Sequence, residues 1–373
     1  MIEGLPEPDR ISGAPHPRDT PALIGQGHAE TTFLAAYTAD RLHSGWLITG
    51  PQGVGKATLA YRIAAFLLAA KPADSGLFGA PQPQTTLDTP TDDPDLRLIR
   101  AGAHPRLFIL RRGPNDKGDR LSADIRADQV RALKSFFHLS ATDGGHRVVI
   151  IDSADDLNRS AANALLKELE EPPARTTLLL IAHQPSRLLP TIRSRCRELR
   201  LTTLTPEDLG SALAATGTAP VAPDALAVLA GGSVGDAIRL THQDGLAAYA
   251  TLVDLLSGLP RIDRPALIKL GESCAGKGAE TRFPLILDLI DLFLARAARA
   301  GLLGEPATQG APGEARLLAR IAPDDRAARR WAALQQDIGA RARQGRALNL
   351  DPAALILDMV CKIEETAHSL ATA

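Results

Sequence analysis

Residues 46–58 read WLITGPQGVGKAT, and this stretch decides the fold of the first half of the chain. An apolar run at 46–49 leads directly into the pattern G-x-x-x-x-G-K over 50–56, and a helical pattern follows. In such a loop, glycines let backbone N–H groups close around phosphates, while the helix N-terminus and a lysine add positive charge. The succession of strand, loop and helix predicts a P-loop, whose phosphate-binding candidates are Gly50, Gly53, Gly55 and Lys56.

Three further apolar runs indicate more strands. They lie at residues 107–110, 148–151 and 178–181, each between segments with helical patterns. Continuous apolar runs of this kind are typical of strands that are buried on both faces of a parallel sheet. We therefore predict an α/β domain over residues 21–203.

The second half of the chain carries helical patterns only. Thr205 is a predicted N-cap ahead of Pro206 in a first helical turn, and amphipathic Ala/Leu patterns follow. A proline-rich boundary at 260–265 interrupts them. We predict a small helical lid over residues 204–262 and an all-helical domain over residues 263–373.

The composition is that of an ordinary globular chain. Its 373 residues, 45% hydrophobic and 23% charged with a net charge of -1, suit two or three domains. A net charge near zero argues against a protein that coats nucleic acid by itself. The three cysteines form no C-x-x-C pair, and no apolar run approaches the roughly 20 residues of a membrane span. We therefore expect a cytoplasmic protein without a membrane segment.

Two segments are expected to be loose. Residues 1–20 are rich in Pro, Gly and charge, which predicts a flexible N-terminal arm. Residues 71–95 are crowded with Pro, Asp, Thr and Gly, which predicts a long insertion within the α/β domain.

The P-loop departs from an active ATP site at the residue after its lysine. The full motif places a Ser or Thr hydroxyl on magnesium, whereas this chain has Ala57 there. Thr58 carries the next hydroxyl, but a helix turns about 100° per residue, so this hydroxyl should point elsewhere. Two interpretations of this loop remain. It is either a degenerate phosphate site that includes Thr58 or a P-loop kept only as a packed structural turn.

A second remnant of an ATP site follows the strand predicted at 147–151. Asp152 stands at the end of that strand, as the carboxylate of a Walker B motif does. Hydrolysis in this class needs an acid beside it to activate water, and here that position is Ser153. Asp152 therefore either holds a metal ion through water or caps the following turn.

Residues 158–173 read NRSAANALLKELEEPP, and residues 191–196 read TIRSRC. Taken alone, the first segment predicts an amphipathic surface helix that is ended by a double proline. Together with the apolar run at 178–181, the two segments closely resemble the clamp-loader branch of the AAA+ family. The resemblance covers the P-loop domain and the lid, and more weakly the C-terminal helices. It implies a RecA-like AAA+ domain, a helical lid and a helical collar for oligomerisation.

The resemblance also implies which roles are lost and which one is kept. Positions that touch nucleotide or metal in an active subunit are degraded here: Ala57, Ser153, Ala182-His183 and Gly235. No ATPase activity of its own is therefore expected. The SRC arginine of relatives reaches the ATP of the adjacent subunit, which assigns the role of an arginine finger in trans to Arg195. Without the resemblance, the default for Arg195 is an ion pair with a local acid such as Glu198.

Cofactors and partners follow from the same resemblance. No cofactor is required, and weak binding of ATP or phosphate at the P-loop is allowed. No zinc is expected, because residues 71–95 lack the four cysteines that many relatives carry there. The implied partners are the motor (gamma/tau) and delta subunits of the loader, and through them the sliding clamp and primer-template DNA. Residues 346–352, RALNLDP, with the helical pattern after them resemble the last collar helix.

The function implied is that of a non-catalytic component of a replicative DNA polymerase complex, which helps load a ring-shaped clamp on primed DNA. Two alternatives stay open. One is a self-sufficient AAA+ ATPase or helicase motor that uses Thr58 for magnesium and a displaced acid for water. The other is a standalone regulator that senses nucleotide without hydrolysing it.

Overall fold

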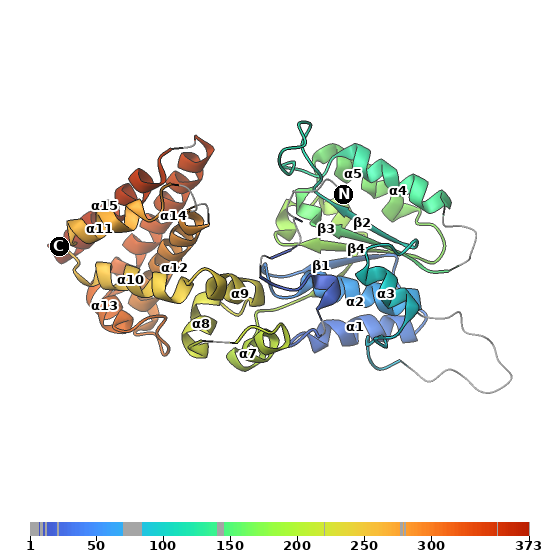
Figure 1. The fold of residues 1–373 in the computed structure, drawn as a ribbon, viewed down its shortest axis with the longest axis horizontal. Helices are drawn as coiled ribbons and strands as arrows, with labels where there is room; N and C mark the ends of the chain where they lie inside the picture. The colour runs from blue at the N-terminus through green and yellow to red at the C-terminus, as the bar shows by residue number, and fades with distance from the viewer. Residues whose placement is uncertain are drawn as a thin grey trace. The chain divides into compact units, whose positions relative to one another are not determined.

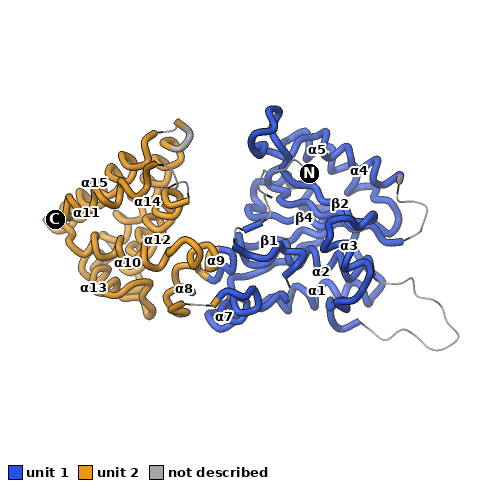
Figure 2. The backbone as a smooth tube through the Cα atoms, viewed as in Figure 1, with its two compact units in different colours: residues 1–218, 232–235 blue, residues 219–231, 236–373 orange. Residues whose placement is uncertain are grey.

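The computed structural model describes residues 7, 10–11, 13–20, 22–69, 84–139, 145–219, 221–276, 279, 281–348 and 350–372. The chain forms two compact units, Met1–Thr218 with Gly232–Gly235, and Ala219–Gly231 with Asp236–Ala373 (Figure 2). The first unit contains the strands, and the second is helical. Within the described ranges, no helix combines the length and the apolar character needed to cross a membrane.

The first unit is built on a five-stranded sheet with the order β2-β3-β4-β1-β5 (Figure 1). The strands are β1 (Gly45–Thr49), β2 (Leu107–Arg111), β3 (Arg147–Asp152), β4 (Thr176–Ala182) and β5 (Arg197–Arg200). All four neighbouring pairs are parallel, which confirms the predicted parallel sheet. The apolar runs predicted four of these strands. The fifth, β5, has no apolar run because it is a short edge strand with exposed charged side chains.

Helices cover both faces of the sheet, because side chains along each strand alternate between the two faces. On one face, Trp46 packs against Phe33 of α1 (Gly27–Thr38), with ring centroids 5.1 Å apart. On the other face, Leu47 belongs to a buried cluster with residues of α4 (Ala127–Leu139) and α5 (Arg159–Glu170). The P-loop helix α2 (Lys56–Ala69) packs against β3 and β4 and is buried along most of its length. These layers hold the loops at the strand ends in fixed positions.

Polar caps fix the helices near the candidate site. Asn158 accepts a hydrogen bond from the Ala161 N–H at the start of α5 (2.8 Å), and α5 ends before the double proline. Thr205 caps α7 (Pro206–Ala215) by accepting from the Asp208 N–H, as predicted. Two short 3-10 helices, η3 (Ala154–Asp156) and η4 (Pro185–Arg187), follow β3 and β4.

Some described residues of the N-terminal arm, which the sequence predicted to be loose over 1–20, contact the first unit. His16 is buried beside the 3-10 helix η1 (Pro17–Asp19), and its ring lies edge-on to Tyr61 of α2. Glu7 forms an ion pair with Arg111 at the end of β2 (2.9 Å). Composition did not predict this packing, because a single buried ring and one ion pair anchor the segment. Residues 1–6, 8–9 and 12 lie outside the described residues.

The predicted insertion at 71–95 is only partly described, since residues 71–83 lie outside the described ranges. Its second part carries ordered structure. Asp93 accepts hydrogen bonds from the backbone N–H groups of Asp95 and Leu96 and thereby caps α3 (Pro94–Arg100). The helix begins inside the predicted insertion because Asp-Pro supplies an N-cap and a first helical residue.

The second unit consists of helices that pack along one another. They are α8 (Pro223–Ala230), α9 (Val234–His242), α10 (Gly245–Ser257), α11 (Arg264–Glu272), α12 (Arg282–Leu303), α13 (Glu314–Ile321), α14 (Asp325–Ala347) and α15 (Pro352–Ala371), with the first two residues of α9 in the first unit. Helix α12 packs along α14, and α11 along α15. Trp331 of α14 is buried and donates a hydrogen bond from Nε1 to the Ile321 carbonyl (2.9 Å).

A fully buried carboxylate joins helices of the second unit. Glu314 accepts a hydrogen bond from the Tyr249 hydroxyl (2.6 Å) and forms an ion pair with Arg296 (2.5 Å). Because Tyr249 lies on α10, this bond connects the predicted lid with the predicted collar. The compact units therefore divide the chain differently from the predicted borders at 204 and 262. Helix α7 groups with the α/β unit, and α8 and α10 group with the later helices.

Candidate functional site

The loop between β1 and α2 has the backbone of a P-loop and is closely packed. Its three glycines have positive φ angles: Gly50 (139°), Gly53 (75°) and Gly55 (100°). A Cβ atom added at these positions would lie 2.5 Å from the Leu201 carbonyl, 2.3 Å from Ser233 Oγ and 2.6 Å from Leu23 Cδ1, respectively. Only glycine therefore fits at all three positions. The loop predicted from the sequence is present, and neighbouring segments contact it on three sides.

Lys56 binds carbonyl groups of its own loop. Its ammonium group donates hydrogen bonds to the carbonyl oxygens of Gly50 (2.7 Å) and Pro51 (2.5 Å), and only 3% of the residue is exposed. Burial lowers the pKa of Lys56 to about 8, against the opposing influence of Asp152 and Asp155. The lysine ammonium group, which in a P-loop binds phosphate, is here hydrogen-bonded to backbone carbonyl oxygens.

Residues 233–235 pack directly onto the loop. The Gly235 N–H donates a hydrogen bond to the Gly53 carbonyl (3.0 Å). A Cβ atom at Gly235 would lie 2.5 Å from Ile11 Cδ1 and 3.0 Å from Gly53 Cα. A side chain at the position where an active relative is expected to carry Arg would therefore require Ile11 to move and the backbone at Gly53 to shift slightly.

Four residues stand where a P-loop protein would bind magnesium. Ala57 has no hydroxyl, and Thr58 is buried within α2. Asp152 lies half-buried at the end of β3, and the neighbouring Ser153 is buried. The structure thus brings Asp152 to the P-loop edge of the sheet, as predicted, but places no acid directly beside it in sequence.

Asp155 is a carboxylate at this edge that sequence reasoning missed. It accepts hydrogen bonds from the backbone N–H groups of His183 (3.1 Å) and Gln184 (3.2 Å), just after β4. Burial and the charge of Lys56 lower the pKa of His183, which favours a neutral ring. Asp155 is therefore engaged in joining the loops after β3 and β4. Its only sequence signal is its position three residues after Asp152.

Gln26 is a second residue that the sequence analysis did not single out. Its buried side-chain amide donates to the Thr202 carbonyl (2.8 Å) and accepts from the Thr202 N–H (3.2 Å). It also lies 3.4 Å from the Val54 carbonyl of the P-loop. Gln26 thereby ties the start of α1 to the loop and to the chain leaving β5.

In the part of the chain that the structure describes, no group of three or more His, Cys, Asp or Glu side chains is arranged to hold a metal ion. Burial raises the pKa of Cys196 to about 12, so its thiol is protonated at neutral pH. The expectation of no zinc in 71–95 stays a prediction, since much of that segment lies outside the described residues.

Arg195 lies at the opposite edge of the sheet from the P-loop, in the turn between α6 (Pro190–Arg193) and β5. Its Nη2 atom lies 2.7 Å from Glu170 Oε1, and its Nη1 atom donates to the Thr191 carbonyl (3.0 Å). The sequence offered Glu198 as an example of a local ion-pair partner for Arg195, whereas the structure pairs Arg195 with Glu170. Glu198 instead accepts a hydrogen bond from the hydroxyl of Thr49 (2.6 Å).

The register of β1 and β5 separates Arg195 from the P-loop of its own chain. Trp46 pairs with Arg197, so Arg195 precedes β5 at the amino edge, whereas Gly50 follows β1 at the carboxyl edge. Six residues of strand at about 3.3 Å per residue amount to roughly 20 Å. A single side chain does not span that distance.

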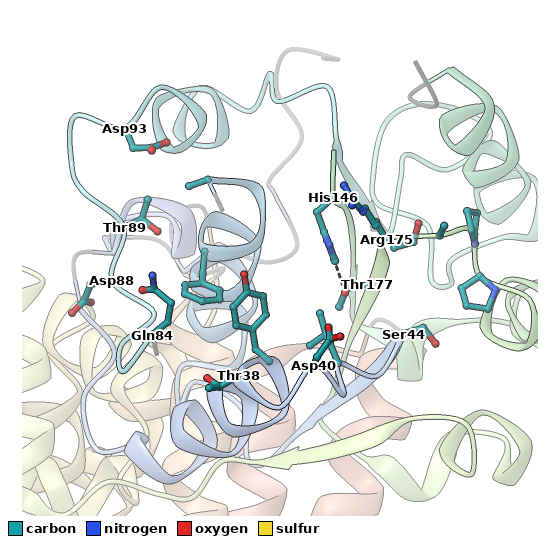
Figure 3. Close-up of a pocket in the computed structure, with 18 of the residues that line it drawn as sticks. Thr38, Asp40, Ser44, Gln84, Asp88, Thr89, Asp93, His146, Arg175 and Thr177 are labelled. Atoms are coloured by element: carbon teal, nitrogen blue, oxygen red, sulfur yellow. Dashed lines mark hydrogen bonds between the residues drawn. The ribbon is translucent and has the colours of Figure 1, made fainter. Parts of the chain in front are cut away.

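A separate hollow of about 1170 Å³ opens near the amino ends of β1 and β4 (Figure 3). His146 points toward Thr177 there and bonds its hydroxyl (2.9 Å). Burial, together with the nearby charges of Arg175 and Arg106, lowers the pKa of His146 to about 4. The hollow shares no lining residue with the P-loop or with Arg195, so it is distinct from both.

Comparisons with known proteins agree with this geometry. Residues 25–205 match the family model described as "DNA polymerase III, delta subunit". The delta' subunit of DNA polymerase III from Pseudomonas aeruginosa is 45% identical over 151 residues, which are 40% of each chain. The Escherichia coli K12 delta' subunit is 33% identical over 230 residues, 60% of this chain and 62% of that one. The Bacillus subtilis delta' subunit is 31% identical over 208 residues, 56% of each.

The chain thus spans about 40–62% of the length of these curated relatives. A P-loop after β1 of a parallel sheet with the order 5-1-4-3-2, followed by helices, is the architecture of an AAA+ protein, and the relatives named above are subunits of the clamp-loader type. Within that class, the chain resembles the delta-prime subunits of DNA polymerase III, and the match to the family model covers residues 25–205.

Proposed function

We propose that this chain is a clamp-loader subunit without ATPase activity of its own, which supplies Arg195 as an arginine finger to a neighbouring ATPase subunit. The observation that carries the proposal is the contrast between the carboxyl ends of the strands, where the P-loop lies, and their amino ends, where Arg195 lies. At one edge the P-loop lysine is bound by its own loop, and at the other an arginine lies at the surface.

The P-loop lysine is bound by carbonyl groups of its own loop, which supports the proposal that this chain does not hydrolyse ATP. Residues 233–235 and the side chain of Leu23 pack against the loop, and the Gly235 N–H donates a hydrogen bond to the Gly53 carbonyl. Neither a hydroxyl at position 57 nor an acid at position 153 is available to bind magnesium or activate water. Weak binding of phosphate or ATP at Gly53–Lys56 would require Lys56 to release its carbonyl partners.

The position of Arg195 supports an action in trans. It is 36% exposed and is separated from its own P-loop by the length of the sheet. Phosphoryl transfer spreads negative charge over the γ-phosphate oxygens, and a guanidinium group meets that charge with paired N–H donors. Such a group acts on the ATP of an adjacent subunit that docks at this edge.

The relatives of the chain support a proposal for its partners. Relatives of this chain include the tau subunit of DNA polymerase III from Escherichia coli K12, which is 29% identical over 59% of this chain. We propose assembly with the motor (gamma/tau) and delta subunits, through the helical unit, and clamp loading on primer-template DNA during replication. The free chain is then a non-catalytic component of the polymerase complex.

The test is the Arg195→Ala variant in a loader reconstituted with motor and delta subunits. Single-turnover hydrolysis at the site that Arg195 faces should fall about 1000-fold or more, because arginine fingers contribute roughly 10³ to 10⁵ in rate. Assembly, followed by size-exclusion chromatography, should not change, because an exposed ion pair contributes little to the fold. Arg193→Ala, an exposed arginine two residues earlier, is the matched control. If the Arg195→Ala loader assembles normally and hydrolyses ATP at the wild-type rate at every site, Arg195 is not an arginine finger, and its role is the ion pair with Glu170.

A further inference from the structure

Glu170 is the last residue of α5, and its backbone is held by the core of the first unit. The preceding Leu169 and the earlier Leu165 both belong to the buried cluster beneath α5. The following double proline prevents the helix from continuing. The carboxylate of Glu170 therefore projects from a fixed point at the surface.

The guanidinium group of Arg195 is held from two sides. Glu170 Oε1 lies 2.7 Å from Nη2, and the Thr191 carbonyl accepts from Nη1 at 3.0 Å. Thr191 belongs to α6, which is anchored by the fully buried Ile192. Arg195 thus contacts two elements that are each fixed in the core, although 36% of its side chain is exposed.

This arrangement leaves donors available for a ligand. A guanidinium group has five N–H donors, and the two contacts use two of them, which leaves about three for phosphate oxygens. A side chain that is held in its working geometry loses less entropy when it binds than a freely rotating one. The contacts therefore orient Arg195 without consuming its capacity to bind.

We propose that Glu170 is the positioning residue for Arg195, so that the arginine is presented to the neighbouring subunit's nucleotide in a preset orientation. This inference rests on the proposed function of Arg195. Glu170 itself contacts neither nucleotide nor metal in this role and acts only through the guanidinium group. The adjacent Glu171 is exposed, and within the described chain no partner of its carboxylate is found, so it has no such role.

The experiment compares Glu170→Ala, Glu170→Gln and the control Glu171→Ala in the reconstituted loader. An exposed ion pair accounts for at most about a fivefold effect, whereas a displacement of about 1 Å in a catalytic group costs about 100-fold. We expect single-turnover hydrolysis at the site facing Arg195 to fall about tenfold in Glu170→Ala, with the affinity for ATP unchanged. Glu170→Gln keeps a side-chain oxygen as acceptor and should recover most of the loss, and Glu171→Ala should behave as wild type.

The double variant Glu170→Ala/Arg195→Ala separates the two claims. It should hydrolyse ATP no more slowly than Arg195→Ala alone, because Glu170 acts only through Arg195. If Arg195→Ala slows hydrolysis while Glu170→Ala matches Glu171→Ala or is faster than wild type, the positioning role is refuted and the finger stands. If Arg195→Ala has no effect, the proposed function itself fails. Should Glu170→Ala not assemble, Glu170→Gln carries the test, and a tenfold loss in that variant despite its retained acceptor would overturn the proposal.

Discussion

The Nζ atom of Lys56 lies 2.7 Å from the carbonyl oxygen of Gly50, six residues earlier in its own loop. A P-loop lysine that serves a nucleotide must direct its charge outward, whereas this lysine neutralises the dipoles of its own loop. The loop is thereby closed on itself, with glycines at the three positions where a side chain would collide with a neighbour.

This closure predicts that the isolated chain hydrolyses ATP no faster than a Lys56→Met variant. Turnover should stay below about 0.1 per second, against roughly 1 to 1000 per second for typical enzymes. The measurement is phosphate release by the purified protein, with circular dichroism to show that the variant is folded. Faster turnover that the substitution abolishes would favour the self-sufficient ATPase.

Gly50→Ala should destabilise the first unit. The substitution forces a side chain into a φ of 139° and brings its Cβ to 2.5 Å from the Leu201 carbonyl, which is backbone and cannot rotate away. We expect the free energy of unfolding to fall by about 1–3 kcal/mol. Gly27→Ala, at the first residue of α1, is the control: no neighbouring atom lies within 4 Å of the added Cβ, and the free energy of unfolding should change by less than about 1 kcal/mol. Equal urea midpoints for the two variants would contradict the packing described for the loop.

Glu314→Ala should destabilise the helical unit strongly. Removal of the buried carboxylate leaves the Arg296 charge and the Tyr249 hydroxyl without their partner, and burial already raises the pKa of Tyr249. Breaking a buried pair in this way costs about 3–5 kcal/mol. Urea unfolding of Glu314→Ala, compared with the exposed Glu305→Ala, provides the measurement. A loss no larger than that of the control would mean that the network contributes little.

The stability of the first unit should depend on pH through His146. Its pKa is about 4 in the folded chain, below the value of about 6.5 for an unfolded one. The unfolded state therefore binds the proton first, and the free energy of unfolding decreases as the pH falls from 6.5 to 4, by up to about 3 kcal/mol. Unfolding measured across this pH range should show a weaker dependence in His146→Gln. The exposed His28→Gln variant should retain the wild-type slope.

The sequence predicted the features that depend on local patterns. The apolar run at 46–49 and the glycines after it predicted β1 and the P-loop, because strand burial and positive φ leave signatures within a few residues. Thr205 likewise predicted the start of α7. Asp152 was placed correctly at the end of β3 for the same reason.

Features that depend on contacts between distant segments were not predictable. Glu198 is three positions from Arg195 and Glu170 is 25 positions away, and the packing of α5 beside α6 brings the more distant Glu170 to Arg195. The bond between Tyr249 and Glu314 spans 65 positions, so the grouping of α10 with the later helices has no local signal. Assembly and the action of Arg195 in trans stay predictions.

The two tryptophans of the chain are distributed one to each compact unit. Trp46 is fully buried in the first unit, with the Arg197 guanidinium 5.3 Å from its ring, and Trp331 is fully buried in the second. Each unit thus carries its own intrinsic fluorophore in a dry environment. A Trp46→Phe variant leaves only the emission of the second unit, and a Trp331→Phe variant leaves only that of the first. Thermal unfolding of the two single variants therefore records the order in which the units melt, without any attached dye.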